Sequence, residues 1–266
     1  MNRFFVLLLP VFMLGVLIFD KGEFKASSVQ TEISEEDRAR ALFEDFDERR
    51  RAITYETSLM EMRIIDRRER VRSRSMRTWS YSGAEASRSL TQFEAPADVR
   101  GTGLLTLEEN GSEQQLLYLP AVGRVQTVSG SQRTERFLGS DFTFEDLGNQ
   151  NPDDFDFEIL TDTETELKIK AVPKSESQYA WIHFHLDPQK MVLNRADYFN
   201  DRGEQFKKLT ASDYQEVREG VWRPGTMIMR DLEANRRTEI RWKERVFDEP
   251  IPSRFFTERH LQRGVQ

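Results

Sequence analysis

Polar and apolar residues alternate with a period of two over most of this chain, beginning near Thr57. Successive side chains of a strand point to opposite faces, so this alternation predicts β-structure. Turn-forming sequences such as Asn110-Gly111 and Asp187-Pro188 separate the runs. The predicted strands lie at residues 60–65, 71–76, 90–93, 104–107, 115–119, 124–128, 155–160, 167–172, 180–186, 191–199, 206–214, 226–231 and 238–246. Short strands joined by tight turns predict one large antiparallel meander, and a sheet of this width is expected to curl.

A helical period precedes the strands. Ser34, with Asp37 three residues later, resembles a helix N-cap. The apolar residues that follow recur at helical spacing among charged ones: Ala39, Leu42, Phe43, Phe46 and Ile53. This pattern predicts an amphipathic helix of about five turns that covers one face of the sheet. Two short helices are also predicted, one near residues 143–147 and one after Pro252.

The chain opens with sixteen apolar residues, from Phe4 to Phe19, directly after Arg3. Small residues follow at Ala26-Ser27-Ser28, and this order is typical of a secretory signal peptide. We therefore predict a signal peptide at residues 1–28 and a single domain at 29–266. The alternative is an uncleaved N-terminal anchor, although sixteen residues fall short of the about 20 that span a bilayer. Both interpretations place the domain outside the cytoplasm.

Composition narrows the functional classes. The 39 basic and 46 acidic residues give a net charge of −7, so nucleic acid is not an expected partner. The chain has no cysteine, which excludes disulfides and a lipoprotein anchor. The charges are segregated, with six arginines between positions 67 and 77 and an acidic stretch at 137–167. The basic stretch is either a solvated face or a face that meets anionic lipid head groups or an acidic partner.

Catalytic motifs are missing from the sequence: there is no cysteine nucleophile, GxSxG elbow, P-loop or HExxH motif. His183 and His185 share one face of a predicted strand and could begin a metal site, but chelation needs a third ligand. The acidic residues near Asp153 lack the spacing of a calcium loop. We predict no enzyme activity, no metal and no cofactor, and a metal-dependent or carboxylate enzyme is the alternative.

Large apolar side chains are abundant for so charged a chain, with 19 Phe, 8 Met and 4 Trp. Methionine is frequent on surfaces that accept varied apolar partners, although core packing is its simpler interpretation. A curled sheet with few covering helices is expected to leave an apolar cavity. The residues predicted to line it, or to form a lid over it, are Leu42, Phe43, Phe46, Met60, Met62, Phe142, Phe144, Phe157, Ile182, Phe184, Met227, Met229 and Trp242.

Two segments carry a family resemblance: LLYLPAVGRVQTV at 116–128 and FLGSDFTFEDL at 137–147. Together with Trp222-Arg223-Pro224 and Asp248-Glu249-Pro250-Ile251-Pro252, they resemble the outer-membrane lipoprotein-sorting protein family, whose fold is that of LolA and LolB. The element Gly139-Ser140-Asp141-Phe142 is the most specific part of the match.

The resemblance implies a mainly β (α+β) fold, with one curved antiparallel sheet forming an unclosed β-barrel under an N-terminal helix and short lid helices. It implies a periplasmic carrier of a Gram-negative bacterium that holds the acyl chains of lipids or lipoproteins. The implied partners are that cargo, an inner-membrane exporter and, transiently, a membrane. No catalytic residues follow from it. An alternative is a regulatory envelope protein of the RseB type that binds a membrane partner.

Overall fold

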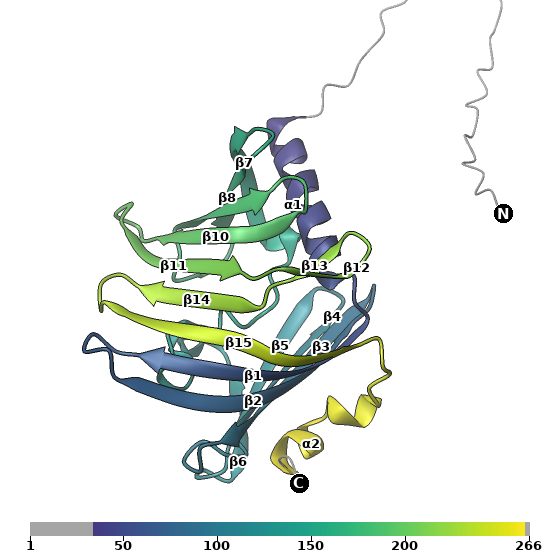
Figure 1. Cartoon of the computed structure of the whole chain (residues 1–266), viewed down its shortest axis with the longest axis vertical. Coiled ribbons are helices and arrows are strands. Elements are labelled where there is room, and N and C mark those ends of the chain that lie inside the picture. The colour runs from purple at the N-terminus through teal and green to yellow at the C-terminus, as the bar shows by residue number, and fades with distance from the viewer. Residues whose placement is uncertain (1–33, 264–266) are drawn as a thin grey trace, which may run out of the picture. The chain divides into compact units, whose positions relative to one another are not determined.

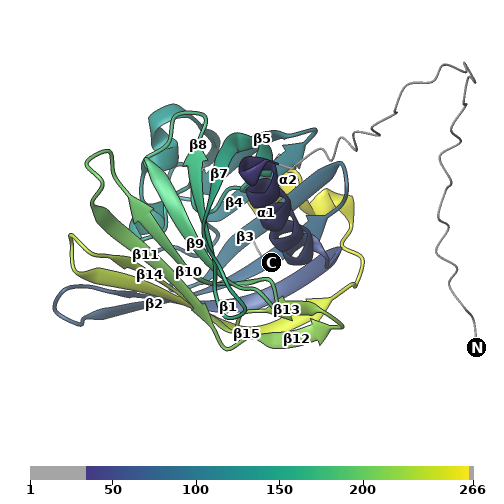
Figure 2. The ribbon, with the colours of Figure 1, turned by 90° about the horizontal axis from the view of Figure 1, so that it is seen from above.

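One curled sheet dominates this computed structural model, which describes residues 34–263. In that part of the chain thirteen strands form a single antiparallel sheet, in the order β6-β5-β4-β3-β2-β1-β15-β14-β11-β10-β9-β8-β7. The sheet curls without closing, because its edge strands β6 and β7 do not pair with each other (Figure 2). The predicted fold class is confirmed. The predicted signal peptide at 1–28 lies outside the described residues.

The first half of the chain builds the sheet from its centre to one edge. Its strands are β1 (Tyr55–Ile65), β2 (Val71–Ser82), β3 (Ala86–Ala95), β4 (Gly103–Glu109), β5 (Ser112–Leu119) and β6 (Arg124–Val128). Each contains or overlaps a run that alternation predicted. β1 is central because it pairs with β2 on one side and with the last strand, β15, on the other (Figure 1).

The second half of the chain returns from the opposite edge to the centre. Its strands in this sheet are β7 (Phe155–Asp162), β8 (Leu167–Pro173), β9 (Trp181–Asp187), β10 (Val192–Phe199), β11 (Gln205–Ser212), β14 (Thr226–Asp231) and β15 (Arg236–Phe247). Two further strands, β12 (Gln215–Arg218) and β13 (Val221–Arg223), form a separate small ribbon. Sequence alternation missed this ribbon because strands of three or four residues are too short to show a period.

Helix α1 (Glu35–Arg51) begins where the sequence predicted, since the Ser34 side chain accepts a hydrogen bond from the backbone N–H of Asp37 at 3.0 Å. The helix lies on the concave side of the sheet near edge strand β7 (Figures 1 and 2). There the ring of Phe43 stacks on Phe157, with centroids 4.7 Å apart, and meets Phe184 edge-on at 5.1 Å. Ile53, predicted as part of the stripe, lies beyond the end of the helix.

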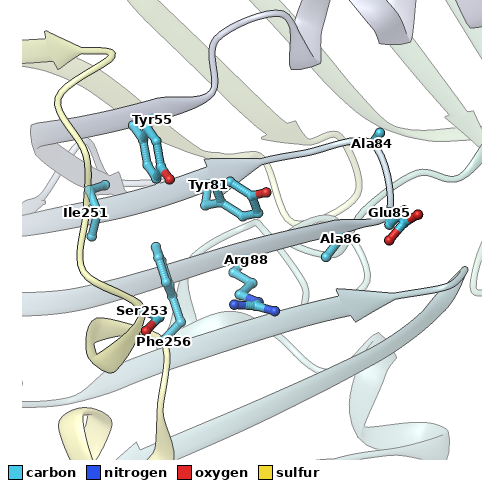
Figure 3. A pocket seen from close by; sticks show the side chains of 9 residues that line it. All are labelled: Tyr55, Tyr81, Ala84, Glu85, Ala86, Arg88, Ile251, Ser253 and Phe256. Carbon is cyan, nitrogen blue, oxygen red and sulfur yellow. The ribbon is translucent and has the colours of Figure 1, made fainter.

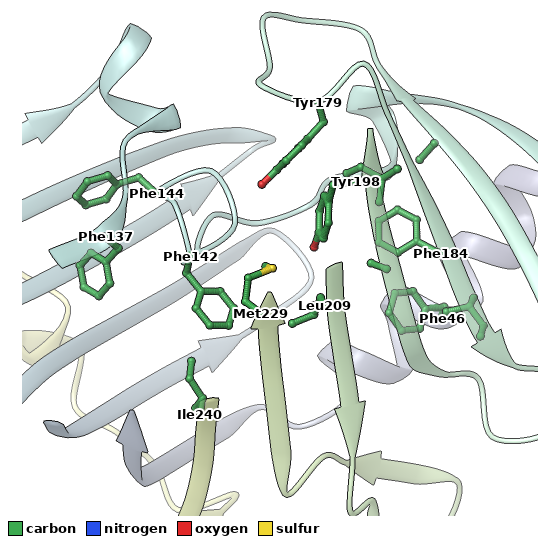
Figure 4. Close-up of a cluster of buried hydrophobic side chains, with 14 of the residues drawn as sticks. Phe46, Phe137, Phe142, Phe144, Tyr179, Phe184, Tyr198, Leu209, Met229 and Ile240 are labelled. Carbon is green, nitrogen blue, oxygen red and sulfur yellow. The ribbon is translucent and has the colours of Figure 1, made fainter. Parts of the chain in front are cut away.

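The segment between β6 and β7 fills the hollow of the sheet. Phe137, Phe142 and Phe144 are buried there in one cluster with Met229 and Ile240. Phe142 lies beside Met229 and Ile240, whereas Phe137 and Phe144 pack on each other with ring centroids 5.4 Å apart (Figure 4). The helix predicted near 143–147 is wrong, because this stretch is a turn. Within the turn, the carboxylate of Asp146 accepts hydrogen bonds from both the backbone N–H and the hydroxyl of Thr143, at 2.7 and 2.9 Å. This reciprocal pattern also occurs at helix N-termini, but the Asp146 carboxylate is bound in addition by Tyr179 and Lys207 from distant parts of the chain, and the segment stays a turn.

The convex face of the sheet carries a second, smaller core. Leu90, Leu105 and Leu116, from β3, β4 and β5, are buried against Phe256 and Leu261. Leu261 belongs to α2 (Glu258–Arg263), which follows a short 3-10 helix, η4 (Ser253–Phe255). The prediction of a helix after Pro252 is therefore confirmed. This part of the sheet is buried on both faces. For this reason polar and apolar residues alternate little in β4, whose sequence includes Leu104-Leu105-Thr106-Leu107.

Candidate functional site

Most of the residues predicted to line a cavity are packed inside the solid core on the concave face. Met62, Phe184 and Met229 are almost wholly inaccessible to solvent. Leu42 is partly buried against the same cluster. The other predicted residues that lie in this core away from the cavity described below are Phe43, Met60, Phe142, Phe144, Phe157 and Ile182. Alternation therefore placed these side chains on the correct face, but packing fills the space in front of them.

Two buried polar clusters pin the loop that fills the hollow. The side chain of Asp141, in the family-like Gly139-Ser140-Asp141-Phe142 element, accepts a hydrogen bond from the hydroxyl of Thr238 on β15 at 2.7 Å. Arg236 lies against the same carboxylate, with Nε 2.6 Å from Oδ1. Burial nevertheless raises the pKa of Asp141 above the usual value for aspartate. The element that carried the resemblance thus fastens the loop to the centre of the sheet.

The second cluster joins the loop to β11. Lys207 Nζ lies 2.5 Å from Asp146 Oδ2, and the two side chains are only 5% and 4% exposed. Lys207 also donates to the hydroxyl of Tyr179 at 2.7 Å, and this hydroxyl donates to Asp146 Oδ1 at 2.6 Å. Burial and the neighbouring Asp146 carboxylate raise the pKa of Tyr179 well above its usual value. The three groups form a closed network in the core.

Among residues 34–263, an apolar cavity lies at the end of the hollow where α1 ends. Its volume is about 270 Å³, and residues from α1, β1, β10, β13, β14 and β15 line it. Of the residues predicted for a cavity, it brings together Phe46, Met227 and Trp242. Sequence reasoning missed the rest of its apolar wall, which is formed by Met191, Val192, Leu193, Tyr214, Trp222 and Pro224.

Charged side chains surround this apolar wall. Five cations line the cavity: Arg49, Arg50, Lys190, Arg223 and Arg245. Glu56 is the only carboxylate among its described lining residues. Arg223 and Arg245 both lie against Glu56, with Nε–Oε2 and Nε–Oε1 distances of 3.4 and 3.1 Å. Burial lowers the pKa of Arg223 and lowers that of Arg245 to about 10, so both remain charged at neutral pH.

A bulge in β15 places Arg245 in the cavity. Trp242 pairs with Met60, whereas Glu244 pairs with the adjacent Leu59, so Lys243 is one extra residue in β15. An extra residue reverses which face the following side chains occupy. Arg245 therefore faces inward like Trp242, although it lies three positions later in the sequence. Strict alternation assigns it to the outer face, which is why sequence reasoning missed it.

Two other hollows are larger but more polar. One, of about 570 Å³, lies beside Tyr55, Tyr81 and Arg88 and the segment after β15 (Figure 3). Its cation is already neutralised, because Arg88 forms an ion pair with Glu109 at 2.7 Å. The other, of about 950 Å³, lies between the end of α1 and neighbouring hairpins, where Arg51 pairs with Glu108 at 3.1 Å. Neither offers the mostly apolar wall that is typical of a ligand pocket.

The paired histidines are engaged with protein groups. His185 contacts Glu166 through Nδ1 at 2.9 Å and Asp197 through Nε2 at 3.1 Å. The ring of His183 lies against Phe199, with centroids 4.6 Å apart. Within residues 34–263 no group of three or more histidine or acidic side chains is arranged to hold a metal ion. Sequence spacing put both rings on one face, but they point to different partners.

The arginine-rich stretch forms the hairpin between β1 and β2. Arg70 pairs with Asp66 at 2.6 Å and Arg77 with Glu94 at 2.8 Å, so part of the charge is neutralised. Arg67 and Arg72 are exposed. Among the described residues, the structure contains no helix with the length and apolar character needed to cross a membrane.

Comparison with known proteins identifies the family. A family model with the description "Uncharacterized protein" matches residues 85–263, which is well over half of the chain. The chain belongs to this family. The matched region includes both segments that carried the resemblance, and it extends through β15 and α2. A search of curated proteins found no match.

Several solved structures are similar to this chain and show which fold it has. A domain described as an outer-membrane lipoprotein-sorting protein, from Vibrio parahaemolyticus, is 25% identical with a TM-score of 0.80, covering 85% of this chain and 99% of that one. A DUF1329 family protein from Desulfovibrio piger is also 25% identical, with a TM-score of 0.79 and coverage of 86% and 99%. A LolA superfamily protein from Nitrosomonas europaea shares the fold at 18% identity and a TM-score of 0.64, with coverage of 84% and 98%. This chain therefore has the LolA-like fold, and the predicted resemblance to lipoprotein-sorting proteins is confirmed.

Proposed function

We propose that this protein is a carrier of the bacterial envelope that binds an acyl chain of a lipid or lipoprotein in the apolar cavity. The observation that supports this most is the cavity wall, where Phe46, Met227, Trp222 and Trp242 face a common space of about 270 Å³. Apolar walls with few polar groups are typical of sites for hydrophobic ligands. The lipoprotein-sorting description of a relative with the same fold points to the same cargo class.

The cavity volume sets how much hydrocarbon it can hold. If a methylene needs about the volume of a water molecule, roughly 30 Å³, the cavity holds about nine carbons. Burying them gains about 0.8 kcal/mol each, or roughly 7 kcal/mol before the costs of binding. A longer chain then needs additional space, which movement of α1 could supply because Phe46 lines the cavity.

Because a longer chain needs additional space, α1 is the proposed lid of the carrier. Phe43 and Phe46 anchor α1 on the sheet, with their rings 5.6 Å apart, and Leu42 packs beside them. Outward movement of the helix would open the cavity toward the concave core and allow loading and release. Phe142 and Phe144, which the sequence also suggested for the lid, are held by the Asp146 network and would move only if that network opened.

The proposed location is the periplasm of a Gram-negative bacterium, with the N-terminal apolar segment as export signal or as inner-membrane tether. An inner-membrane exporter is the proposed donor or acceptor, with transient membrane contact during transfer. We propose binding without catalysis. A regulatory protein of the RseB type remains the alternative, and its membrane partner would bind regardless of whether lipid occupies the cavity.

Lipid recovered with the protein tests the proposal. The full chain is expressed with its leader in a Gram-negative host, purified without detergent and analysed by native mass spectrometry. We expect an acyl lipid at a defined stoichiometry, and uptake of a fluorescent acyl probe by protein from which the lipid has been extracted.

A filled cavity provides the matched comparison. Met227→Trp puts an indole into the cavity and should lower probe uptake at least about fivefold. Val246→Trp adds the same ring at an exposed position of β15 and should leave uptake unchanged. Lipid-free protein that takes up no probe, or equal uptake by both variants, would overturn the carrier proposal.

A further inference from the structure

The residues that line the cavity carry more cations than carboxylates. Arg49 and Arg50 are neutralised on the helix itself, because Arg49 pairs with Asp45 at 2.9 Å and Arg50 with Asp47 at 2.5 Å. The remaining three cations, Lys190, Arg223 and Arg245, face one carboxylate, that of Glu56. Lys190 is exposed to solvent, whereas Arg223 and Arg245 are largely buried. A buried charge without a full partner is costly, so two buried guanidiniums beside one carboxylate need an explanation.

Arg223 has a structural role. Its guanidinium donates to the backbone carbonyl of Arg49, at the C-terminal end of α1, and to that of Trp222, at 3.4 and 3.1 Å. Carbonyls at the end of a helix attract cations. Arg223 therefore joins the small β12–β13 ribbon to α1, and its donors are used within the protein.

Arg245 differs from Arg223 in having unused donors. Its side chain is only 12% exposed, and its single close polar contact within residues 34–263 is Nε with Glu56. Hydrogen-bond geometry is not satisfied even there, so Nε is a buried donor without an acceptor. Glu56 itself also accepts from the hydroxyl of Ser58 at 2.8 Å. The guanidinium lies over the ring of Trp242, with 4.5 Å between Cζ and the ring centroid.

Lys190 supplies a second cation on another wall of the cavity. Its Nζ lies 4.6 Å from the centroid of the Trp222 ring, and the residue lines the cavity while remaining exposed to solvent. Both tryptophans of the cavity thus lie against a cation, Trp222 against Lys190 and Trp242 against Arg245, and both line the cavity. This is the arrangement expected for a ligand with a hydrocarbon part and an anionic end.

We propose that the cavity binds a single-chain amphiphile with an anionic head group, a carboxylate or a phosphate, whose charge Arg245 and Lys190 hold while its chain lies along Trp222, Trp242 and Met227. The inference rests on the proposed carrier function and adds a class of ligand to it. A guanidinium suits both head groups, since its planar set of N–H donors can bond two oxygens at once. Neutral and cationic amphiphiles of the same length lack this contact.

Ten-carbon probes test the proposal, because their chains match the cavity. Decanoate, decyl phosphate, decanol and decyltrimethylammonium are titrated below their micellar concentrations into lipid-free full-length protein, by calorimetry and by tryptophan fluorescence. We expect decanoate and decyl phosphate to bind at least about tenfold more tightly than decanol, and the cationic probe to bind most weakly.

Substitution assigns the preference to Arg245. Arg245→Met keeps an unbranched side chain without its charge, and it should reduce the affinity for the anionic probes about tenfold while changing that for decanol less than threefold. Arg241→Met is the matched control, since Arg241 lies on the same strand, pairs with Glu239 at 3.1 Å and does not line the cavity. Circular dichroism and the unfolding midpoint of each variant show that it folds.

The outcomes separate this inference from the carrier proposal. Equal binding of decanol and decanoate would overturn the head-group inference and leave the carrier proposal standing. A preference for anions that Arg245→Met leaves intact would also overturn it. Tight binding of inorganic phosphate alone, at the affinity of decyl phosphate, would show an anion site without a lipid role. Failure of all four probes to bind would count against both proposals.

Discussion

Replacing Lys207 by methionine removes the cation from the buried network that holds the loop in the hollow. Methionine keeps the unbranched shape of the side chain, so the loss is mainly that of charge and hydrogen bonds. The carboxylate of Asp146 would stay buried, because its side chain is 4% exposed. Lys207 would no longer donate to Asp146 or to the hydroxyl of Tyr179.

The expected magnitude follows from what Asp146 retains. Removing one partner of a buried ion pair typically costs 3–5 kcal/mol, since it leaves an uncompensated charge. Asp146 keeps hydrogen bonds from Thr143 and Tyr179, at 2.7, 2.9 and 2.6 Å, so we expect the lower end of that range, about 3 kcal/mol. This is a large part of the 5–15 kcal/mol by which a native protein is typically stable.

Urea unfolding followed by circular dichroism and by tryptophan fluorescence measures this loss. Lys208→Met is the matched control, because Lys208 lies on the opposite face of β11, and it should change the free energy of unfolding by less than about 0.5 kcal/mol. Adding Asp146→Asn to Lys207→Met removes the orphaned charge and should restore at least about 1 kcal/mol. A cost below about 1 kcal/mol for Lys207→Met, or a double variant no more stable than it, would refute the reasoning.

Two further predictions concern the convex core and the histidine pair. Leu261→Ala should lower the free energy of unfolding by about 2–5 kcal/mol and expose the C-terminus to proteolysis, because Leu261 is fully buried against β3–β5; unchanged protection would contradict the packing. Burial and the nearby Lys168, His185 and Lys170 lower the pKa of His183 to about 4, against a weaker opposing effect of Asp197. The folded state therefore resists protonation, and stability present at neutral pH is lost as pH falls from about 6.5 toward 4. The variant His183→Gln lacks this group, so in urea titrations its free energy of unfolding should fall less over that pH interval than that of the unsubstituted protein. The difference should be no more than about 1 kcal/mol because the ring is partly exposed, and equal losses in the two proteins would contradict the prediction.

Periodicity was sufficient to predict α1 and the strands of the large sheet because local patterns encode them. Ser34 and the apolar stripe located α1, and alternation located the thirteen strands of the sheet. It also gave the correct face for Ile182 and Phe184, which are buried. These features depend on residues that are close in sequence, so a single chain contains the information.

The candidate site depends on contacts that local patterns do not encode. Alternation shows that the side chains of Met62 and Met227 point to the concave face. Only tertiary packing determines that Met62 is buried against other side chains, whereas Met227 lines the cavity. The bulge at Lys243 depends on pairing with β1 and reverses the face of Arg245. The turn at 143–147 depends on Asp146, whose partner Lys207 lies about 60 residues away in sequence. Each error arose where a long-range contact overrode a local preference.

Pairing of β1 with β15 has a consequence for how the chain acquires its structure. Met62 pairs with Ile240, so the two strands at the centre of the sheet come from nearly opposite ends of the domain. Joining such distant segments closes a very long loop, and topologies dominated by non-local pairings fold slowly. Until the ribosome has released β15, the β1–β6 hairpins and the β7–β14 hairpins can only exist as separate halves with open edges. Loss of the last thirty residues, which include nearly all of β15, would therefore remove the strand that joins the two halves of the sheet.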